Sequence, residues 1–183
     1  MNVMSDRKQH IIDVAANLFL SEGVGVSTAR IAKAAGVANG TLFNAFPTKQ
    51  MLIDEVYRTA KMAMFGALVH SAGAPFNRSH IYDNWQGYLT WARANPRSHQ
   101  VMHLLLESGL ASAGTRAEVD ALAAPHGEWV RAALEDGVIT GPSAAHIGRL
   151  ILAQADLALS ENLEGADADL AFDMLCKSIG LDK

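Results

Sequence analysis

The chain has 183 residues, half of them apolar, which is enough for one sizeable hydrophobic core or two small ones. Its formal charge of −4 excludes a uniformly basic surface, and its single cysteine, Cys176, excludes an internal disulfide framework and suits a reducing compartment. No apolar stretch approaches the length of a membrane span, and the first ten residues lack the apolar segment of a signal peptide. We therefore expect a cytoplasmic protein that does not bind membranes.

The composition predicts an all-α protein. Only 7% of the residues are aromatic and alanine is abundant, which favours closely packed helices. Valine, isoleucine and threonine form no clean alternating run, so strands are not expected.

The first predicted helix covers residues 7–21. Ile11, Ala15, Leu18 and Phe19 recur at helical spacing and should form its buried stripe. Ser5 or Asp6 could cap its start, and Gly23 should end it.

Residues 27–49 contain two short predicted helices separated by a tight turn. Ser27 can cap the first of them, over residues 27–35, and Gly36 stands where a helix end needs a left-handed backbone. Only three residues separate Gly36 from the next helix-compatible run, residues 40–46. Such a short turn forces the helices to cross steeply, as in a helix-turn-helix whose second helix enters the DNA major groove.

This segment resembles the N-terminal domain of the tetracycline-repressor (TetR) family of bacterial transcriptional regulators. The matching residues are Ile31-Ala32, Ala35-Gly36-Val37, Gly40-Thr41-Leu42-Phe43, Phe46 and Lys49. The resemblance covers about the first third of the chain. It implies an all-α fold with an N-terminal three-helix helix-turn-helix domain and a C-terminal helical domain for ligand binding and dimerisation.

Three positions depart from the family pattern. Ala38 replaces a serine that would cap the recognition helix, so this cap falls to Asn39 or is absent. Phe43 replaces a tyrosine whose hydroxyl reaches a phosphate, and Ala45 replaces a larger side chain. These departures concern the strength of phosphate anchoring and leave the fold prediction unchanged.

The expected DNA contacts follow from side-chain chemistry and from the resemblance. Short polar side chains on the second helix suit base edges, and Gly40 lets the backbone approach the duplex. Asn39 can also cap the helix, and Arg7 can instead be a solvated helix start. The predicted DNA-binding residues are Arg7, Ser27, Thr28, Asn39, Gly40, Thr41, Phe43, Asn44 and Lys49.

The N-terminal part of the chain carries a more positive net charge than the rest, as expected if it binds DNA. Residues 1–60 hold six Lys and Arg against five Asp and Glu, whereas residues 61–183 hold nine against fourteen. The N-terminal part is therefore the less acidic one, which is compatible with phosphate contacts.

A connecting helix is predicted from about residue 48 to about residue 70, and further helices over residues 81–94, 98–110 and 115–136. Pro125 and Gly127 should kink or split the last of these. Gaps beside such a kink could hold a small, apolar or aromatic effector, although ordinary core is the alternative for each residue. The predicted ligand-binding residues are Met62, Phe65, Trp85, Tyr88, Met102, His103, His126 and Trp129.

His99 and His103 are four residues apart and share a helix face with Glu107. A metal site or a small helical enzyme built on these three residues is one alternative, but no cysteine or suitably spaced carboxylate completes a metal set. No nucleophile elbow, phosphate loop or cysteine pair occurs, so we predict no catalytic residue, no metal and no cofactor.

Two terminal helices, over residues 143–161 and 166–179, carry apolar stripes. They could complete the core or dock on their twins in a four-helix homodimer interface. We predict a dimer, because two reading helices are needed to contact a palindrome. The predicted interface residues are Ile147, Leu150, Ile151, Gln154, Leu157, Leu170 and Met174.

The sequence thus predicts a ligand-responsive repressor of two domains. Residues 1–50 would bind a double-stranded DNA operator, and residues 51–183 would bind the effector and form the homodimer. A DNA-binding regulator without a ligand, and a helical interaction module that has lost DNA binding, remain alternatives.

Overall fold

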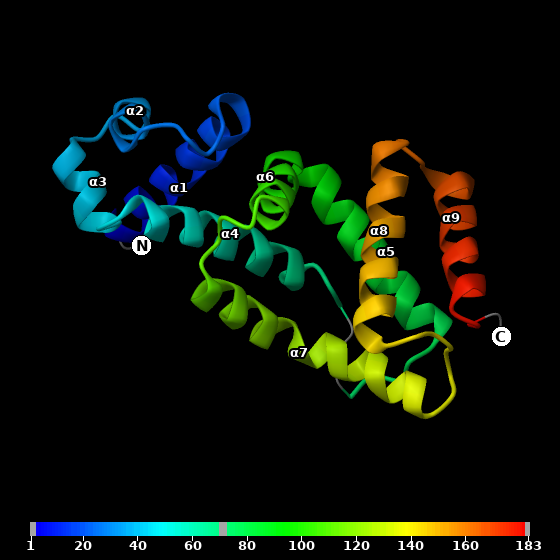
Figure 1. The fold of residues 1–183 in the computed structure, drawn as a ribbon. Coiled ribbons are helices and arrows are strands. Elements are labelled where there is room, and N and C mark those ends of the chain that lie inside the picture. The colour runs from blue at the N-terminus through cyan, green and yellow to red at the C-terminus, as the bar shows by residue number, and fades with distance from the viewer. Residues whose placement is uncertain (1–2, 70–72, 182–183) are drawn as a thin grey trace. The chain divides into compact units, whose positions relative to one another are not determined.

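The computed structural model describes residues 3–69 and 73–181, and within these ranges it contains helices and no strand. The prediction of an all-α fold is confirmed. The helices (Figure 1) are α1 (Val3–Glu22), α2 (Thr28–Ala34), α3 (Asn39–Ala45), α4 (Lys49–Gly66), α5 (Arg78–Ala94), α6 (Pro96–Glu107), α7 (Ala113–Glu135), α8 (Ala144–Ser160) and α9 (Gly165–Ser178). None of them is both long enough and apolar enough to cross a membrane.

The helices form two compact units. The first combines the described residues up to Ala63 with Asn95–Val119, and the second combines the described residues of 64–94 with those from Asp120 onwards. Helices α4 and α7 each begin in the first unit and end in the second. The functional division near residue 50 stays a prediction.

In the first unit, α1 packs against α2 and α6, and α2 packs against α3. The predicted stripe of α1 is buried: Ile11 and Ala15 are fully buried, and Phe19 is 1% exposed. Gly23 adopts a positive φ of 82° and ends α1 as predicted. This apolar seam supports the two short helices that follow.

A polar network ties α4 to the segment that joins α6 and α7. The buried Asp54 carboxylate accepts hydrogen bonds from the Ser112 amide at 2.8 Å and from Gln50 Nε2 at 3.0 Å. Gln50 Nε2 also donates to the Leu110 carbonyl at 2.8 Å, and Arg58 donates to Glu118 Oε2 at 2.6 Å. Each bond joins residues of the first unit, so the start of α7 belongs to the same body as α4 up to Ala63.

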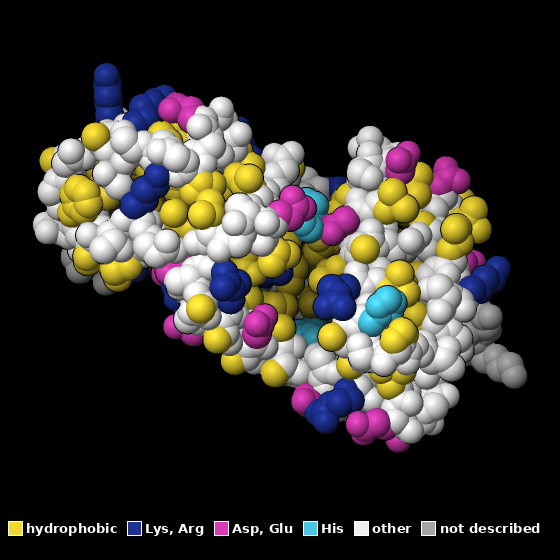
Figure 2. Space-filling view, in the orientation of Figure 1, with side chains coloured by type: hydrophobic (Ala, Val, Ile, Leu, Met, Phe, Trp, Pro, Cys, Tyr) yellow, Lys and Arg dark blue, Asp and Glu magenta, His cyan; other side chains and the backbone are white. Residues whose placement is uncertain are grey.

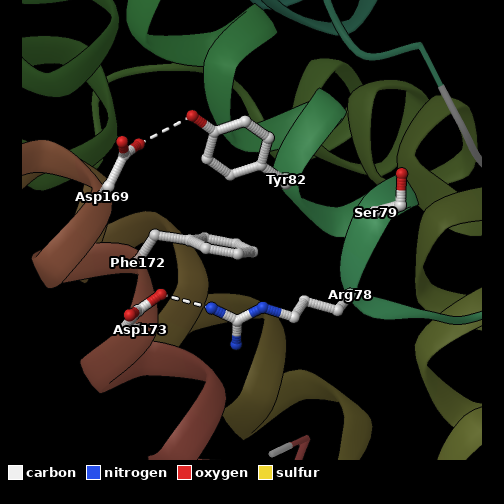
Figure 3. Close-up of a pocket in the computed structure, with 6 residues that line it drawn as sticks. All are labelled: Arg78, Ser79, Tyr82, Asp169, Phe172 and Asp173. Atoms are coloured by element: carbon white, nitrogen blue, oxygen red, sulfur yellow. Dashed lines mark hydrogen bonds and ion pairs between the residues drawn. The ribbon is translucent and has the colours of Figure 1, made fainter. Parts of the chain in front are cut away.

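In the second unit, α5 packs against α8 and α9, and α8 packs against α9. Trp85, Leu89 and Phe172 are at most 2% exposed and form its centre. Figure 3 shows how polar groups flank Phe172: Arg78 pairs with Asp173, and the Tyr82 hydroxyl donates to Asp169 Oδ1 at 2.6 Å. These pairs hold α9 against the beginning of α5.

Several predicted helix boundaries were wrong. Helix α1 begins at Val3, so Ser5 and Asp6 lie inside it and do not cap it. Helix α5 begins at Arg78, because the Asn77 side chain accepts a hydrogen bond from the His80 amide at 2.9 Å. The connecting helix α4 ends at Gly66, and the predicted end at His70 lies outside the described residues.

Helix α7 is one continuous helix from Ala113 to Glu135, so the predicted split at Pro125 is absent. Proline removes the hydrogen bond to the carbonyl of Ala121. Both residues lie on the exposed side of the helix, where water can bind that carbonyl.

Replacing Asp54 by alanine should lower the free energy of unfolding by about 1–3 kcal/mol, because the Ser112 and Gln50 donors lose their acceptor. Burial raises the pKa of Asp54, but the hydrogen bonds from Ser112 and Gln50 outweigh it and bring the pKa below 3.8. Since the pKa is lower in the folded chain than in the unfolded chain, this stabilisation is present above about pH 4 and is lost as the pH falls through the folded value. Urea unfolding at neutral and acidic pH measures the effect.

The exposed Asp13 of α1 provides the matched control, since Asp13→Ala should change stability by no more than about 0.5 kcal/mol. A difference between wild type and Asp54→Ala that stays constant on acidification would contradict the assigned role of the carboxylate.

Candidate nucleic-acid interface

Helix α2 begins as the sequence predicts. The Ser27 hydroxyl accepts a hydrogen bond from the Arg30 amide at 3.1 Å and caps the helix. Ile31 and Ala32 are buried, so they fix α2 on the body of the unit. Ser27 is exposed and Thr28 is half-buried, so both side chains lie at the surface where a phosphate contact was predicted.

The turn between α2 and α3 depends on Gly36. Its φ of +64° lies in the left-handed region that favours glycine, and the following Val37 amide donates to the Ala32 carbonyl at 3.0 Å. This bond ends α2 and turns the chain into α3 within four residues. The predicted helix-turn-helix geometry is therefore present.

Helix α3 lacks a side-chain cap. Ala38 is its N-cap residue and makes no side-chain hydrogen bond, whereas Asn39 is already the first helical residue. The suggestion that Asn39 caps the helix was wrong. Because the Asn39 side chain is exposed, it is available for an external contact.

One side of α3 is anchored and the other faces solvent. Leu42 is fully buried and Phe46, which follows the helix, is 2% exposed. In contrast, Asn39, Gly40 and Asn44 are exposed, and Phe43 is 42% exposed. Thr41 is half-buried. Figure 2 shows the outer surface of this unit, where apolar side chains occur among uncharged ones near α3.

Neither the backbone conformation nor any contact within this chain requires glycine at position 40. Its φ is not positive, and a Cβ added there would meet no atom of this chain within 4 Å. Glycine inside a helix is less favourable than alanine by about 0.5–1 kcal/mol. The absent side chain therefore leaves open space on the outer face of α3, where another molecule can approach the backbone.

The cationic side chains nearest in sequence lie on the helices α1, α2 and α4, and none lies on α3. Lys49 is half-buried at the beginning of α4, where Thr48 Oγ1 accepts a hydrogen bond from the Met51 amide at 3.1 Å. Arg7 is exposed on α1, and the neighbouring Lys8 Nζ lies 5.2 Å from the centre of the Phe46 ring. Arg30 points toward the end of α1, because its guanidinium pairs with Glu22 at 2.8 Å.

A second exposed surface lies on α8 and α9. Leu157, Leu170 and Met174 are between 51% and 58% exposed, and Figure 2 shows apolar side chains over these two helices. They line a shallow groove whose members are Gln154, Leu157, Ala158, Glu161, Leu163, Asp167, Leu170, Ala171 and Met174. Sequence reasoning missed five of these residues: Ala158, Glu161, Leu163, Asp167 and Ala171. Asp167 and Ala171 share one face of α9 with Leu170 and Met174, as their spacing of three and four residues indicates.

Other predicted members of that surface lie deeper. Leu150, Ile151 and Gln154 are half-buried, and Gln154 Nε2 donates to the Ala171 carbonyl at 3.4 Å. Ile147 is 1% exposed and belongs to the core of its own unit. It therefore offers no surface to another chain, because its side chain packs inward near Gly141.

The predicted ligand-binding residues divide between the two units. Met62, Met102 and His103 belong to the first, and the second contains the remaining five: Phe65, Trp85, Tyr88, His126 and Trp129. Met62 is 54% exposed, whereas Met102 is 2% exposed. Their common role in one pocket stays a prediction.

Within the second unit, Tyr88 and Trp129 make hydrogen bonds within the chain, whereas His126 makes none that involves its ring nitrogens in the part of the chain that the structure describes. The Tyr88 hydroxyl donates to Asp156 Oδ1 at 2.6 Å, and Trp129 Nε1 donates to the Ala74 carbonyl at 2.7 Å. His126 stacks on Phe65 with ring centres 6.0 Å apart, and both of its buried ring nitrogens lack a hydrogen-bond partner among the described residues. Burial lowers the pKa of His126, which favours the neutral imidazole.

The residues of the alternative enzyme hypothesis also occupy one helix. The rings of His99 and His103 meet edge to face, with centres 4.6 Å apart, and Glu107 is exposed at the end of α6. The three side chains share a helix face, as their spacing predicts.

Comparisons with known proteins agree with the helix-turn-helix geometry. The sequence pattern described as "Bacterial regulatory proteins, tetR family" matches residues 11–56. The HTH-type transcriptional repressor KstR2 of Rhodococcus jostii is 38% identical over 63 residues, which are 34% of this chain and 31% of that protein. The chain therefore matches about a third of the length of this curated relative.

Solved structures are similar over nearly the whole chain. A TetR-family transcription regulator from Shewanella sp. PV-4 is 25% identical, with a TM-score of 0.81 over 94% of this chain and 97% of that one. Another, from Marinobacter aquaeolei VT8, has a TM-score of 0.80 at 18% identity, over 96% of both chains. The second likeness concerns the fold alone.

A helical chain that presents the second helix of a helix-turn-helix to solvent defines the class of helix-turn-helix proteins. The pattern over residues 11–56 and the likeness to solved regulators narrow this class. Residues 11–56 match the pattern of the TetR family of bacterial regulatory proteins, and nearly the whole chain has the fold of a solved TetR-family regulator.

Truncation of a side chain on the anchored side of α3 should cost much more stability than truncation on its exposed side. Leu42→Ala should lower the free energy of unfolding by about 2–5 kcal/mol, because it opens a cavity beneath the helix. Phe43→Ala should change it by no more than about 0.5 kcal/mol, since the ring is already 42% exposed. Urea unfolding followed by circular dichroism measures both values, and a larger loss for Phe43→Ala would reverse the assigned orientation of α3.

Proposed function

We propose that this protein is a cytoplasmic, dimeric repressor that binds a palindromic DNA operator and is released from it by a small hydrophobic effector. The observation that carries the proposal is the orientation of α3, in which Leu42 is fully buried while Phe43 and Asn44 face solvent. The relative KstR2 is named as an HTH-type transcriptional repressor, which supports the same direction of regulation.

The DNA-binding part of the proposal assigns α3 to the major groove. Asn39, Thr41 and Asn44 offer hydrogen-bonding groups of the size that reads base edges. Ser27 and Thr28 at the start of α2, and Lys49 at the start of α4, lie at least partly at the surface, and we assign phosphate contacts to them. Arg7 adds a positive charge on α1 that is suited to the DNA phosphate backbone.

The dimer part of the proposal assigns the groove on α8 and α9 to a second copy of the chain. Leu157, Leu170 and Met174 are large apolar side chains that remain more than half exposed in a single chain. Contiguous exposed apolar surface of this kind marks interaction sites. A two-fold dimer would set two copies of α3 about 34 Å apart, which is one turn of DNA.

The effector part of the proposal assigns residues 51–183 to ligand binding and dimerisation, and residues 1–50 to DNA. His126 supports it, because a buried imidazole without a partner is unfavourable by about 1–3 kcal/mol and a ligand could satisfy it. The Phe65 ring beside it would favour an apolar or aromatic molecule. The effector would lower DNA affinity by binding the DNA-free form more tightly.

Trp85, Trp91 and Trp129, the three tryptophans of the chain, all belong to the second unit. Intrinsic fluorescence therefore reports ligand binding there, without a label. A chain that binds DNA but shows no fluorescence response and no release with any small molecule would be a regulator without an effector.

Asn44→Ala should weaken specific DNA binding by at least about fivefold, because one base-edge contact in each half-site is lost. The measurement is an electrophoretic mobility shift with fragments selected from genomic DNA, repeated at several salt concentrations. Asn17→Ala is the matched control, since Asn17 is an exposed asparagine of α1 on its polar side. Absence of salt-sensitive binding, or equal affinities for both variants, would refute a role for α3 in DNA recognition.

Met174→Glu should convert the dimer into a monomer, because it places a charge in the apolar groove of α8 and α9. Sedimentation equilibrium measures the assembly state, and DNA affinity should fall in parallel since one reading helix covers one half-site. Leu122→Glu is the control, because Leu122 is 48% exposed on α7 and does not line the groove. A dimer that survives Met174→Glu, or is lost in Leu122→Glu, would place the interface elsewhere.

A further inference from the structure

The stretch that contains α3 carries no charge. Residues 34–48 include the turn, all of α3 and the approach to α4, and they contain no acidic, basic or histidine side chain. The cations that border the stretch are Lys33 on α2 and Lys49 at the beginning of α4. Neither is on α3, so the helix itself presents only amide, hydroxyl and apolar groups.

This chemistry matches one kind of base pair better than the other. In the major groove, guanine offers two acceptors that arginine or lysine reads, and cytosine offers a donor that a carboxylate reads. Helix α3 has neither kind of side chain. Adenine offers an acceptor and a donor that asparagine reads together, and thymine offers a methyl group that apolar side chains contact. Helix α3 has both: Asn39 and Asn44 for adenine, and Phe43 for thymine.

The geometry brings these groups to one outward face. Gly40, Phe43 and Asn44 occupy positions i, i+3 and i+4 of the helix, so they are neighbours on its surface. All three are exposed, while Leu42 between them is fully buried. The open space above Gly40 would allow the helix backbone to approach the groove, and the flanking side chains would then reach the base edges.

The chemistry of Phe43 favours contact with an apolar group of the base over contact with a phosphate. Its ring has no hydroxyl, so it cannot donate a hydrogen bond to a phosphate. An apolar ring at 42% exposure loses unfavourable contact with water when a methyl group covers it. The thymine methyl is the apolar group that the major groove provides.

We propose that α3 reads A·T base pairs, with Phe43 packed against a thymine methyl group and Asn44 bound to an adenine edge. In this contact Asn44 Nδ2 donates to adenine N7, and Asn44 Oδ1 accepts from the adenine amino group. The inference rests on the proposed function, because it specifies which operator chemistry the same surface recognises.

The first experiment identifies the bases beneath α3. The full-length protein selects binding sites from a random duplex library, and hydroxyl-radical footprinting locates each half-site. We expect A·T pairs at the positions that lose selectivity in Asn44→Ala, with at least about fivefold weaker binding of that variant to the selected duplex. Selection of G·C pairs at those positions would overturn the inference.

The second experiment removes the thymine methyl groups alone. Deoxyuridine replaces thymidine in the selected half-sites, which deletes one methyl group per base and leaves base pairing intact. Wild-type affinity should fall by about fourfold for each half-site, the value expected for one buried methyl group. Phe43→Ala should bind the thymidine and deoxyuridine duplexes equally, whereas Phe43→Tyr, which keeps the ring, should still discriminate between them.

Matched controls separate this contact from general effects. Deoxyuridine placed outside the half-sites should leave wild-type affinity unchanged, and circular dichroism should show that both Phe43 variants keep the wild-type helical content. Equal wild-type affinity for the two duplexes, or undiminished discrimination in Phe43→Ala, would overturn the assignment. Failure of the proposed function gives a different result, because the protein would then show no salt-sensitive binding to any duplex.

Discussion

The packing of Leu42 and Phe46 beneath α3 is the constraint on which the rest of the site depends. A helix of seven residues is too short to be stable in water by itself, and Ala38 gives it no side-chain cap. Burial of these two side chains therefore supplies the stability that local structure lacks. The same burial fixes the rotation of α3, so it also decides that Phe43 and Asn44 face outward.

The body that holds α3 is larger than the helix-turn-helix. Apolar contacts of α1 join it to α2 and α6, and the Asp54 carboxylate joins α4 to the Ser112 amide. Apolar burial is non-directional, whereas the Asp54 hydrogen bonds require a defined register between segments far apart in the chain. The two kinds of interaction together hold α3 on a rigid support, which the proposed recognition of base edges requires.

The sequence predicted correctly those features that depend only on interactions between neighbouring residues. Ser27 caps α2 and Gly36 adopts the left-handed backbone, because each depends on its immediate neighbours. Helix ends were less predictable: α1 extends back to Val3, and α7 continues through Pro125. In both places several weak preferences compete, and solvent exposure allows more than one outcome.

By itself, the sequence determined the all-α class, the helix-turn-helix and the outward face of its second helix. Helical periodicity, the cap residue Ser27 and the turn residue Gly36 specify them. Only the tertiary structure decided that Asp54 bonds to the chain 58 residues away and that Ile147 is buried while Leu157 is exposed. A periodic stripe shows that a helix has an apolar side but does not show what covers each position. That depends on the neighbouring helices, whose placement arises from contacts between distant residues.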